Sequence, residues 1–221
     1  MKDGIIVINK PDGITSHDVV SKIRRKFNMK RVGHAGTLDP LATGVLVMLL
    51  GKSTKLFDRF VAFDKAYKAT LILGTTTKSA DTQGEIIEQK PFDHITKEMV
   101  LDVFKKFLGE TLQVPPMVSA VKHKGKKLYQ LARQGIEVER TPRKITIYKL
   151  EMIEFKPPYV EFYLECSKGT YVRQLAHDVG QVLHCGACIS QIQRTKVGKF
   201  SIEESVTIED LDESHIQAWQ D

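Results

Sequence analysis

The chain has 221 residues, of which 42 % are hydrophobic, and its formal net charge at pH 7 is +6. This length suffices for one large domain or two small ones. No stretch approaches the ~18 unbroken apolar residues that a membrane-spanning helix needs, and the apolar run Ile5–Ile8 is too short for a signal peptide. The chain has three cysteines, an odd number, which does not suggest a framework of disulfide bonds. Composition thus argues against membrane and disulfide-rich secreted classes and predicts a cytoplasmic protein.

The positive charge is concentrated in two segments. Residues 21–31 hold six Lys or Arg and no acid, and residues 122–149 hold nine Lys or Arg against two acids. Residues 201–221 instead hold seven acids and no Lys or Arg. Such clustering suits a polyanion, nucleic acid first, although Lys and Arg also commonly do no more than solvate helix faces.

The first third of the chain predicts a strand, a helix, a loop and a second strand. Pro11 and Gly13 favour a turn after the first strand, and Thr15 or Ser16 can cap the helix that follows. The expected elements are a strand over Ile5–Asn9, a helix from Thr15 or Ser16 to about Phe27, a loop over Gly33–Gly44 and a strand over Val45–Leu50.

Farther along the chain, alternating apolar residues favour strands and apolar residues at helical spacing favour helices. The expected strands are Tyr67–Leu73, Glu85–Gln89, Ile145–Phe155 with a bulge near Tyr148, and Val160–Cys166. The expected helices are Thr96–Leu108, Lys126–Arg133 and Thr170–Leu183. Strands and helices do not alternate regularly, which favours an α+β fold with a mostly antiparallel sheet flanked by helices.

Asp39 is the first candidate for chemistry. It lies in the segment GHAGTLDPLATG, where Gly33 and Gly36 allow unusual backbone angles and close approach to a ligand. Pro40 pushes Asp39 toward an extended conformation, which limits the orientations of its carboxylate. An ordinary Asp-Pro turn is the competing interpretation.

Three further residues could act with Asp39. Arg173 begins a predicted helix, and a guanidinium beside a desolvated carboxylate keeps that carboxylate charged, although a surface arginine is the commoner case. Tyr67 and Tyr171 could stack on unpaired bases, although core packing is the simpler interpretation of Tyr67.

The sequence gives no sign of a cofactor. Cys185 and Cys188 have the spacing of a zinc half-site, but no second pair completes the four ligands of a structural site. Walker, dinucleotide-binding and nucleophile-elbow motifs do not occur. We therefore expect neither a metal nor an organic cofactor.

Several ordered motifs together resemble the bacterial TruB-type tRNA pseudouridine synthases, which convert uridine 55 of the tRNA T-loop to pseudouridine. The similar blocks are NKPDGITSHDVV at 9–20, GHAGTLDPLATG at 33–44, KAYKATLILG at 65–74, GKKLYQLARQGIEVER at 125–140 and SKGTYVRQLAHDVG at 167–180, followed by the segment after CGAC. The resemblance covers roughly residues 4 to 211. It implies the pseudouridine synthase fold, with a thumb-like insertion over about 115–146.

The resemblance also implies roles for individual residues. Asp39 takes the position of the catalytic aspartate, Arg173 pairs with it, and Tyr67 stacks on the base and helps to remove its C5 proton. Tyr171 and Ile192 wall the base pocket, and His34 contacts the RNA where the base leaves its stack. Asp39 could attack C1′, add to C6 or remove a ribose proton, and the sequence does not choose among these routes.

The expected partner is the T-arm stem-loop of tRNA, and nothing in the sequence demands more than a monomer. The RNA-binding cations expected from the basic segments and motifs are Lys10, Lys22, Arg24, Arg25, Arg31, Lys122, Lys126, Lys127, Arg133 and Arg143. Family members usually continue into a C-terminal RNA-binding domain of the PUA type, whereas this sequence ends at Asp221. We therefore expect a single catalytic domain over 1–221 without that addition.

Two other functions remain open at this point. A chaperone that helps tRNA to fold would use the same basic surfaces without Asp39, and the resemblance implies both roles in one protein. A hydrolase of glycosidic bonds would also act at C1′, but such enzymes usually use two carboxylates, and no second candidate stands out.

Overall fold

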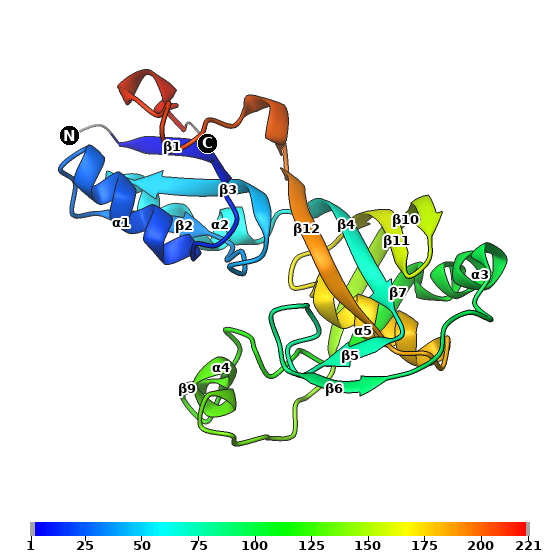
Figure 1. Cartoon of the computed structure of the whole chain (residues 1–221). Coiled ribbons are helices and arrows are strands. Elements are labelled where there is room, and N and C mark those ends of the chain that lie inside the picture. Colours follow the sequence, from blue (N-terminus) through cyan, green and yellow to red (C-terminus); the bar gives the residue numbers. More distant parts are fainter. Residues whose placement is uncertain (1–2, 220–221) are drawn as a thin grey trace. The chain divides into compact units, whose positions relative to one another are not determined.

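The computed structural model of the protein describes residues 3–219 (Figure 1). The chain divides into two units, one formed by Met1–Lys68 with Gln191–Asp221 and the other by Ala69–Ser190. The first unit is therefore made from both ends of the chain, and the second from one continuous stretch. The strands β4 (Lys65–Leu73) and β12 (Ala187–Val197) run through the two points where the chain passes between the units.

A small sheet around β3 (Thr43–Leu50) organises the first unit. The antiparallel partner β1 (Gly4–Lys10) lies along one edge of β3, with Val7 opposite Val47. The other edge is shared by β2 (Val32–Ala35), which is antiparallel, and by β12, which is parallel to β3 at Gln193 and Arg194. The short strand β13 (Phe200–Ser201) pairs with the end of β12.

The helix α1 (Ser16–Lys26) packs on β2 in the first unit (Figure 1). Its beginning is fixed by a capping box, in which the Thr15 hydroxyl accepts from the Asp18 amide at 3.1 Å and the Asp18 carboxylate accepts from the Thr15 amide at 2.8 Å. Val19, Val20 and Ile23 are buried, whereas the Lys and Arg side chains of this helix are exposed. The amphipathic spacing thus directs the positive charge of the helix to solvent.

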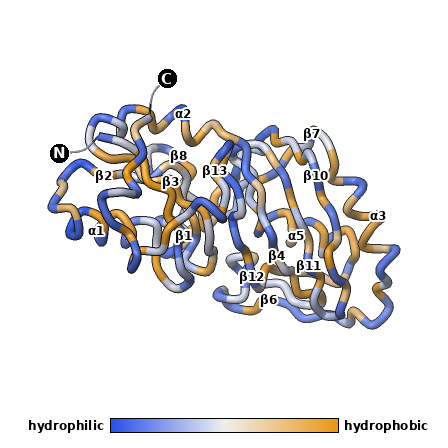
Figure 2. Tube along the Cα trace, turned by 90° about the horizontal axis from the view of Figure 1, so that it is seen from above, coloured by the Kyte–Doolittle hydropathy of each residue, from blue (hydrophilic) through white to orange (hydrophobic). Residues whose placement is uncertain are grey.

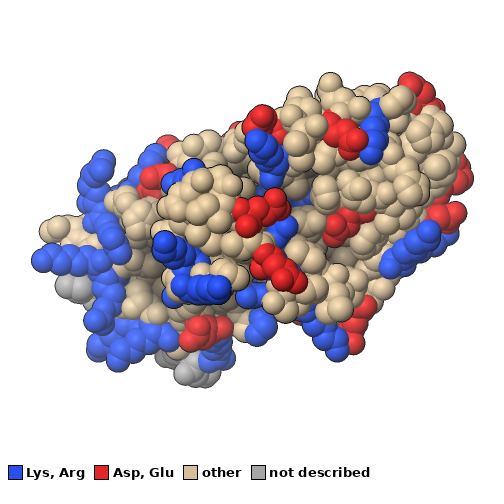
Figure 3. Space-filling model, turned by 90° about the horizontal axis from the view of Figure 1, so that it is seen from below, with Lys and Arg blue, Asp and Glu red and all other residues tan. Residues whose placement is uncertain are grey.

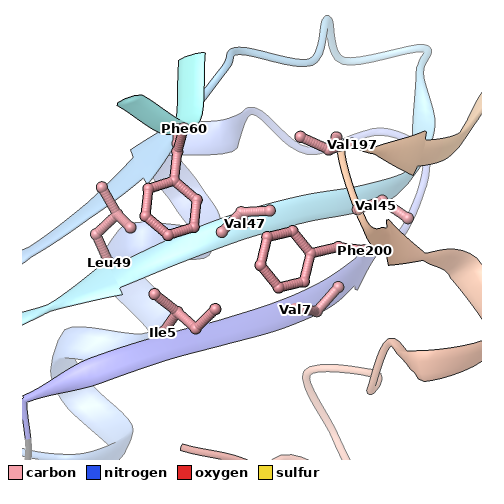
Figure 4. Packing of buried hydrophobic residues seen from close by; sticks show 9 residues of the cluster. Ile5, Val7, Val45, Val47, Leu49, Phe60, Val197 and Phe200 are labelled. Carbon is pink, nitrogen blue, oxygen red and sulfur yellow. The ribbon is translucent and has the colours of Figure 1, made fainter. Parts of the chain in front are cut away.

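The core of the first unit forms between this sheet and two short helical segments, the 3₁₀ helix η1 (Gly51–Leu56) and α2 (Phe57–Val61). The close-up in Figure 4 shows the packed side chains, and the trace in Figure 2 is hydrophobic along β1 and β3. Phe60 stacks on Phe200 with 5.9 Å between ring centroids. The cluster consists of Ile5, Val7, Ala35, Val45, Val47, Leu49, Phe60, Val197 and Phe200.

The segment after β13 closes the outer edge of β1. Ile5 exchanges two backbone hydrogen bonds with Gln217, each of 2.9 Å. Val206 donates to the Val7 carbonyl at 3.0 Å, and its own carbonyl accepts from the Asn9 amide at 2.9 Å. This segment contains two 3₁₀ helices: η2 (Ile202–Glu204) precedes Val206, and η3 (Glu213–His215) lies between Val206 and Gln217. Four backbone groups of this edge, on Ile5, Val7 and Asn9, are therefore satisfied within the chain.

The second unit contains a sheet in the strand order β12-β4-β11-β10-β7. Its other members are β11 (Tyr159–Cys166), β10 (Arg143–Lys156) and β7 (Gly109–Gln113), and β10 is antiparallel to both β11 and β7. The register between β10 and β11 shifts between Ile147 and Lys149. This shift confirms the bulge that the sequence predicts near Tyr148.

Two helices accompany this sheet. The helix α3 (Lys97–Phe107) packs against β10 and against α5 (Val172–Val182). Phe104 of α3 meets Phe162 of β11 edge to face, with 5.7 Å between the ring centroids. A separate hairpin of β5 (Thr75–Thr77) and β6 (Ile86–Gln89) lies between β4 and α3 in the sequence.

The segment between β7 and β10 leaves the sheet and returns to it. It contains the hairpin of β8 (Lys122–His123) and β9 (Lys126–Lys127), followed by the short helix α4 (Leu128–Ala132). Leu128 and Leu131 are buried, and the cations of Lys127 and Arg133 lie 5.7 and 5.5 Å from the centroid of the Tyr129 ring. We call residues 114–142 the insertion.

The structure confirms the predicted α+β class with a mixed, mostly antiparallel sheet and flanking helices. Two local predictions are wrong. The predicted loop over Gly33–Gly44 is shorter, because β2 extends through Ala35 by pairing with β3. The predicted helix over Lys126–Arg133 begins only at Leu128, because Lys126 and Lys127 pair with β8. The strands β7 and β12 are not among the elements that the sequence predicts.

Candidate functional site

The loop that carries Asp39 is tightly fixed at both ends. It connects β2 to β3, and the glycines on its two sides, Gly36 and Gly44, have φ angles of +93° and +96°. Within the loop, the Asp39 carbonyl accepts a hydrogen bond from the Ala42 amide at 3.0 Å. Asp39 is half-buried, so this residue is neither part of the core nor fully exposed to solvent. We call residues 36–42 the Asp39 loop.

Side chains from the N-terminal region hold the middle of the Asp39 loop. The Ser16 hydroxyl accepts from the Leu38 amide at 2.8 Å and donates to the Leu38 carbonyl at 3.0 Å. Lys10 is 0 % exposed, and its ammonium donates to the carbonyls of Pro11, Ile14 and Pro40 at 2.7, 2.7 and 3.2 Å. The expected RNA contact of Lys10 is therefore wrong, because all three donors of the ammonium serve backbone carbonyls.

Burial lowers the pKa of Lys10 from 10.5 to about 8, against the opposing effect of nearby Asp12 and Asp39. Between these two pKa values the unfolded chain binds more protons than the folded chain. The free energy of unfolding should therefore rise with pH across this window, by up to about 3 kcal/mol. Urea unfolding at several pH values, with Lys10→Met as the reference, would measure this difference. A wild-type profile that runs parallel to that of Lys10→Met would contradict the burial of a charged amine here.

The first unit also places three other expected site residues. Tyr67 lies in β4 and is 7 % exposed, and Ile192 lies in β12 and is 9 % exposed. His34 is half-buried in β2, opposite Met48, rather than in the Asp39 loop where the sequence analysis put it. The first unit thus contains Asp39, His34, Tyr67 and Ile192.

Arg173 is held rigidly in the second unit. It is 3 % exposed and lies in the first turn of α5. Its guanidinium donates to the carbonyls of Ser79 and Val118 at 2.5 and 2.8 Å, and its Nε lies 3.6 Å from the Asp81 carboxylate. Asp81 in turn accepts from the Ser79 hydroxyl at 2.5 Å and from the Gln83 amide at 3.1 Å. The simple alternative of a solvent-exposed arginine is therefore wrong.

Tyr171 is fixed by a partner that the sequence analysis missed. Gln113, the last residue of β7, is 4 % exposed. Its side-chain amide donates to the Tyr171 carbonyl at 3.1 Å and accepts from the Tyr171 amide at 2.8 Å. The backbone at the beginning of α5 is therefore anchored to the sheet. The sequence gives only weak signals for the roles of Gln113 and Asp81. Each is a polar residue in a polar stretch, and its structural role depends on a partner far away in the sequence.

The expected RNA-binding cations, apart from Lys10, lie on exposed surfaces. Lys22, Arg25 and Arg31 belong to α1 and the segment that follows it, and Arg24 there donates to the Val32 carbonyl at 3.0 Å. The other expected cations, which lie in the second unit, are also exposed: Lys122, Lys126, Lys127, Arg133 and Arg143. Figure 3 shows Lys and Arg side chains gathered toward the left of the face that it presents. These cations can therefore contact the phosphate groups of a nucleic acid.

The three cysteines are buried, and burial raises the pKa of Cys188 to about 11. Low thiolate content makes such groups poor metal ligands and poor nucleophiles. Within residues 3–219, no group of three His, Cys, Asp or Glu side chains is arranged to hold a metal ion. None of the helices in this range is both long and apolar enough to cross a membrane.

Two family models together match most of the chain. The model described as TruB family pseudouridylate synthase (N terminal domain) matches residues 24–172. The model described as tRNA pseudouridylate synthase B C-terminal domain matches residues 173–221.

Curated relatives cover nearly the whole chain. A protein of Dehalococcoides mccartyi named tRNA pseudouridine synthase B is 50 % identical over 210 residues, which is 95 % of this chain and 70 % of the relative. A protein of Clostridium tetani with the same name is 48 % identical over 215 residues, or 97 % of this chain and 74 % of the relative.

Solved structures give the same picture of the fold. A chain of a Cbf5-Nop10-Gar1 complex matches with a TM-score of 0.74 and 32 % identity, covering 94 % of this chain and 53 % of that one. A chain of an H/ACA RNP bound to a substrate RNA containing 2′-deoxyuridine matches with a TM-score of 0.70 and 29 % identity, covering 94 % and 52 %. The chain thus spans about half the length of these two structural relatives.

Proposed function

Since this chain belongs to the TruB family of pseudouridylate synthases, we propose that it converts the T-loop uridine at position 55 of tRNA to pseudouridine, with Asp39 as the catalytic carboxylate. The observation that carries the proposal is the Asp39 loop, whose backbone is held by the side chains of Lys10 and Ser16. A half-buried carboxylate on a fixed loop meets the target nucleoside in one geometry, which lowers the entropic part of the barrier.

The isomerisation needs little chemistry from the protein. The N1–C1′ bond breaks, the base turns, C5 bonds to C1′, and the proton on C5 leaves while N1 ends protonated. Uridine and pseudouridine are isomers, so no atom enters or leaves and nothing is oxidised. Attack of Asp39 on C1′, its addition to C6 and its removal of a ribose proton each use one carboxylate, and the proposal holds for all three.

The other site residues take supporting roles in this proposal. Arg173 is the second charged group of the reaction, and its contacts with Asp81 and two carbonyls support a fixed orientation. Tyr67 stacks on the base and assists removal of the C5 proton, Tyr171 and Ile192 wall the base pocket, and His34 contacts the flipped nucleotide. Flipping costs a few kcal/mol, which phosphate contacts offset.

The decisive experiment uses the wild-type chain and an unmodified T-arm stem-loop. After incubation, chemical mapping should find pseudouridine at the T-loop position and at no other uridine of the stem-loop. Free uracil as the product would mean hydrolysis of the glycosidic bond and would contradict isomerisation. Unchanged RNA would contradict the proposed substrate.

Promotion of tRNA folding is a second candidate role. It is favoured by the exposed cations of α1 and of the insertion, none of which depends on the Asp39 loop. A variant that lacks the Asp39 carboxylate should still accelerate refolding of a misfolded tRNA. Equal refolding rates with and without the protein would remove this candidate.

The insertion is proposed to grip RNA through its lysines. Lys122→Gln combined with Lys126→Gln should weaken binding of the stem-loop about 3- to 10-fold and reduce the slope of log K against log [salt] by about 1–2. The matched control is Lys97→Gln with Lys106→Gln, two exposed lysines on α3 of the same unit. Titrations from low to high salt measure both effects. A flat salt dependence of the wild type, or an equal loss in the control, would contradict the proposal.

A further inference from the structure

Arg194 is a buried cation whose contacts converge on the Asp39 loop. It is 2 % exposed, and the sequence analysis did not single it out. Its Nε donates to the Val45 carbonyl at 2.7 Å, on the β3 side of the loop. Its two terminal nitrogens donate to the carbonyls of Gly36 at 3.0 Å and Thr37 at 3.5 Å, on the β2 side. One guanidinium therefore joins the two arms of the loop.

The fork geometry of arginine suits this bridge. The planar guanidinium has donors that diverge in fixed directions, so it can serve separate carbonyls at once, whereas a lysine ammonium is a compact point charge. A Cβ placed on Gly36 would lie 3.6 Å from an Arg194 nitrogen, which shows how closely the loop backbone approaches the guanidinium. Charged hydrogen-bond donors are stronger than neutral ones, so the two shorter contacts, to Val45 and Gly36, restrain the loop effectively.

The same strand that supplies Arg194 also supplies Ile192. In β12 these two residues are two positions apart, and both are buried while the intervening Gln193 is half-buried, so they share one face of the strand. The backbone of Arg194 pairs with Gly44 of β3, just beyond the Asp39 loop. A rigid strand therefore connects the proposed base-contacting residue with the loop of the proposed catalytic carboxylate.

We propose that Arg194 is a positioning residue for the reaction: through the carbonyls of Gly36, Thr37 and Val45 it sets where Asp39 stands relative to the Ile192 wall of the base pocket. This inference rests on the proposed function. Arg194 touches no reacting atom and acts through the loop. Its loss should therefore slow the chemical step while leaving the exposed RNA-binding cations unchanged.

Lys65 provides a matched control within the first unit. It is 8 % exposed, and its ammonium donates to the carbonyls of Val61, at 2.6 Å, and Phe63. It is thus another buried cation on backbone carbonyls, but these two carbonyls lie at and just beyond the end of α2 rather than in the Asp39 loop. Lys65→Met measures what the loss of such a cation does to stability alone.

The test compares the wild type, Arg194→Lys, Arg194→Gln and Lys65→Met with the unmodified T-arm stem-loop. Three quantities are measured: the single-turnover rate constant of pseudouridine formation, the Kd for the stem-loop and the midpoint of urea unfolding. Both Arg194 variants should bind with a Kd within about 3-fold of wild type but react at least about 30-fold more slowly, because small displacements of a reacting group have large effects. Lys65→Met should lose stability and keep its rate constant.

Each outcome of this comparison supports or overturns the proposed role of Arg194. Rate constants of the Arg194 variants within about 3-fold of wild type would overturn the positioning role, as would an equal slowing in Lys65→Met. An Arg194→Lys chain that fails to fold under conditions in which Lys65→Met folds would make Arg194 a folding residue first, which also counts against the proposal. A wild-type chain that forms no pseudouridine would instead overturn the proposed function itself.

Discussion

Replacement of Asp39 by Asn should abolish pseudouridine formation and leave tRNA binding nearly unchanged. The amide has almost the same shape as the carboxylate, but it can neither attack carbon nor accept a proton with comparable strength. Removing the central group of an active site commonly costs several orders of magnitude in rate, so we expect a loss of at least about 10⁴-fold. Single-turnover assays with the T-arm stem-loop and a parallel binding titration would measure both effects.

The unfolding midpoint gives the control for this variant. Asp39 is half-buried in the middle of the Asp39 loop, so the substitution should shift stability by no more than about 1 kcal/mol. Asp12→Asn, an exposed acid in the turn after β1, is the matched substitution and should retain the wild-type rate. Normal pseudouridine yield from Asp39→Asn would refute the catalytic assignment.

Replacement of Gly44 by Val should prevent the first unit from folding as observed. A Cβ at this position would lie 2.2 Å from the Arg194 carbonyl oxygen and 3.0 Å from its carbonyl carbon and its backbone nitrogen. Backbone atoms cannot move aside as a flexible side chain can, so β12 would have to separate from β3. The φ angle of +96° adds strain that only glycine avoids. We expect a loss of at least about 4 kcal/mol in the free energy of unfolding.

Gly13→Val separates backbone strain from steric conflict. Gly13 also has a positive φ angle, +80°, but a Cβ there would meet nothing within 4 Å. This control should lose only the strain component, about 1–2 kcal/mol. Urea unfolding of both variants and the wild type gives the comparison. Equal losses at the two positions would show that the approach of β12 to Gly44 does not limit stability.

Local signals in the sequence were sufficient for much of the fold. Thr15 with Asp18 marks the beginning of α1, and the strict alternation from Val160 to Cys166 marks β11, because capping and half-burial depend on neighbouring residues alone. The strand β12 was missed, because its central stretch carries charged and amide side chains, Arg194 among them, without a clean alternation. Its strand character comes from pairing with residues far away in the sequence.

For the site, too, local signals in the sequence predict some residues, whereas residues that depend on distant partners are not predicted. Asp39 and Arg173 were identified as candidates from local context and from family resemblance, but the groups that orient them were not. Asp81 and Arg194 gain their roles from partners about 90 or more residues away, across contacts that no local pattern encodes. Lys10 is predicted to bind RNA because it lies in the motif NKPDGITSHDVV, whereas in the structure it is buried and three carbonyls compensate its desolvation.

The discontinuous make-up of the first unit has a consequence for synthesis on the ribosome. Residues 69–190 form a contiguous unit whose sequence is complete before residues 191–221 have been translated. The first unit, in contrast, needs Phe200 for its aromatic core and Gln217 for the edge of β1. Domains generally fold as units once their sequence has emerged, so the inserted unit can fold first. The Asp39 loop acquires its Arg194 clamp only after the inserted unit has been translated, so assembly of this carboxylate site can follow the folding of that unit.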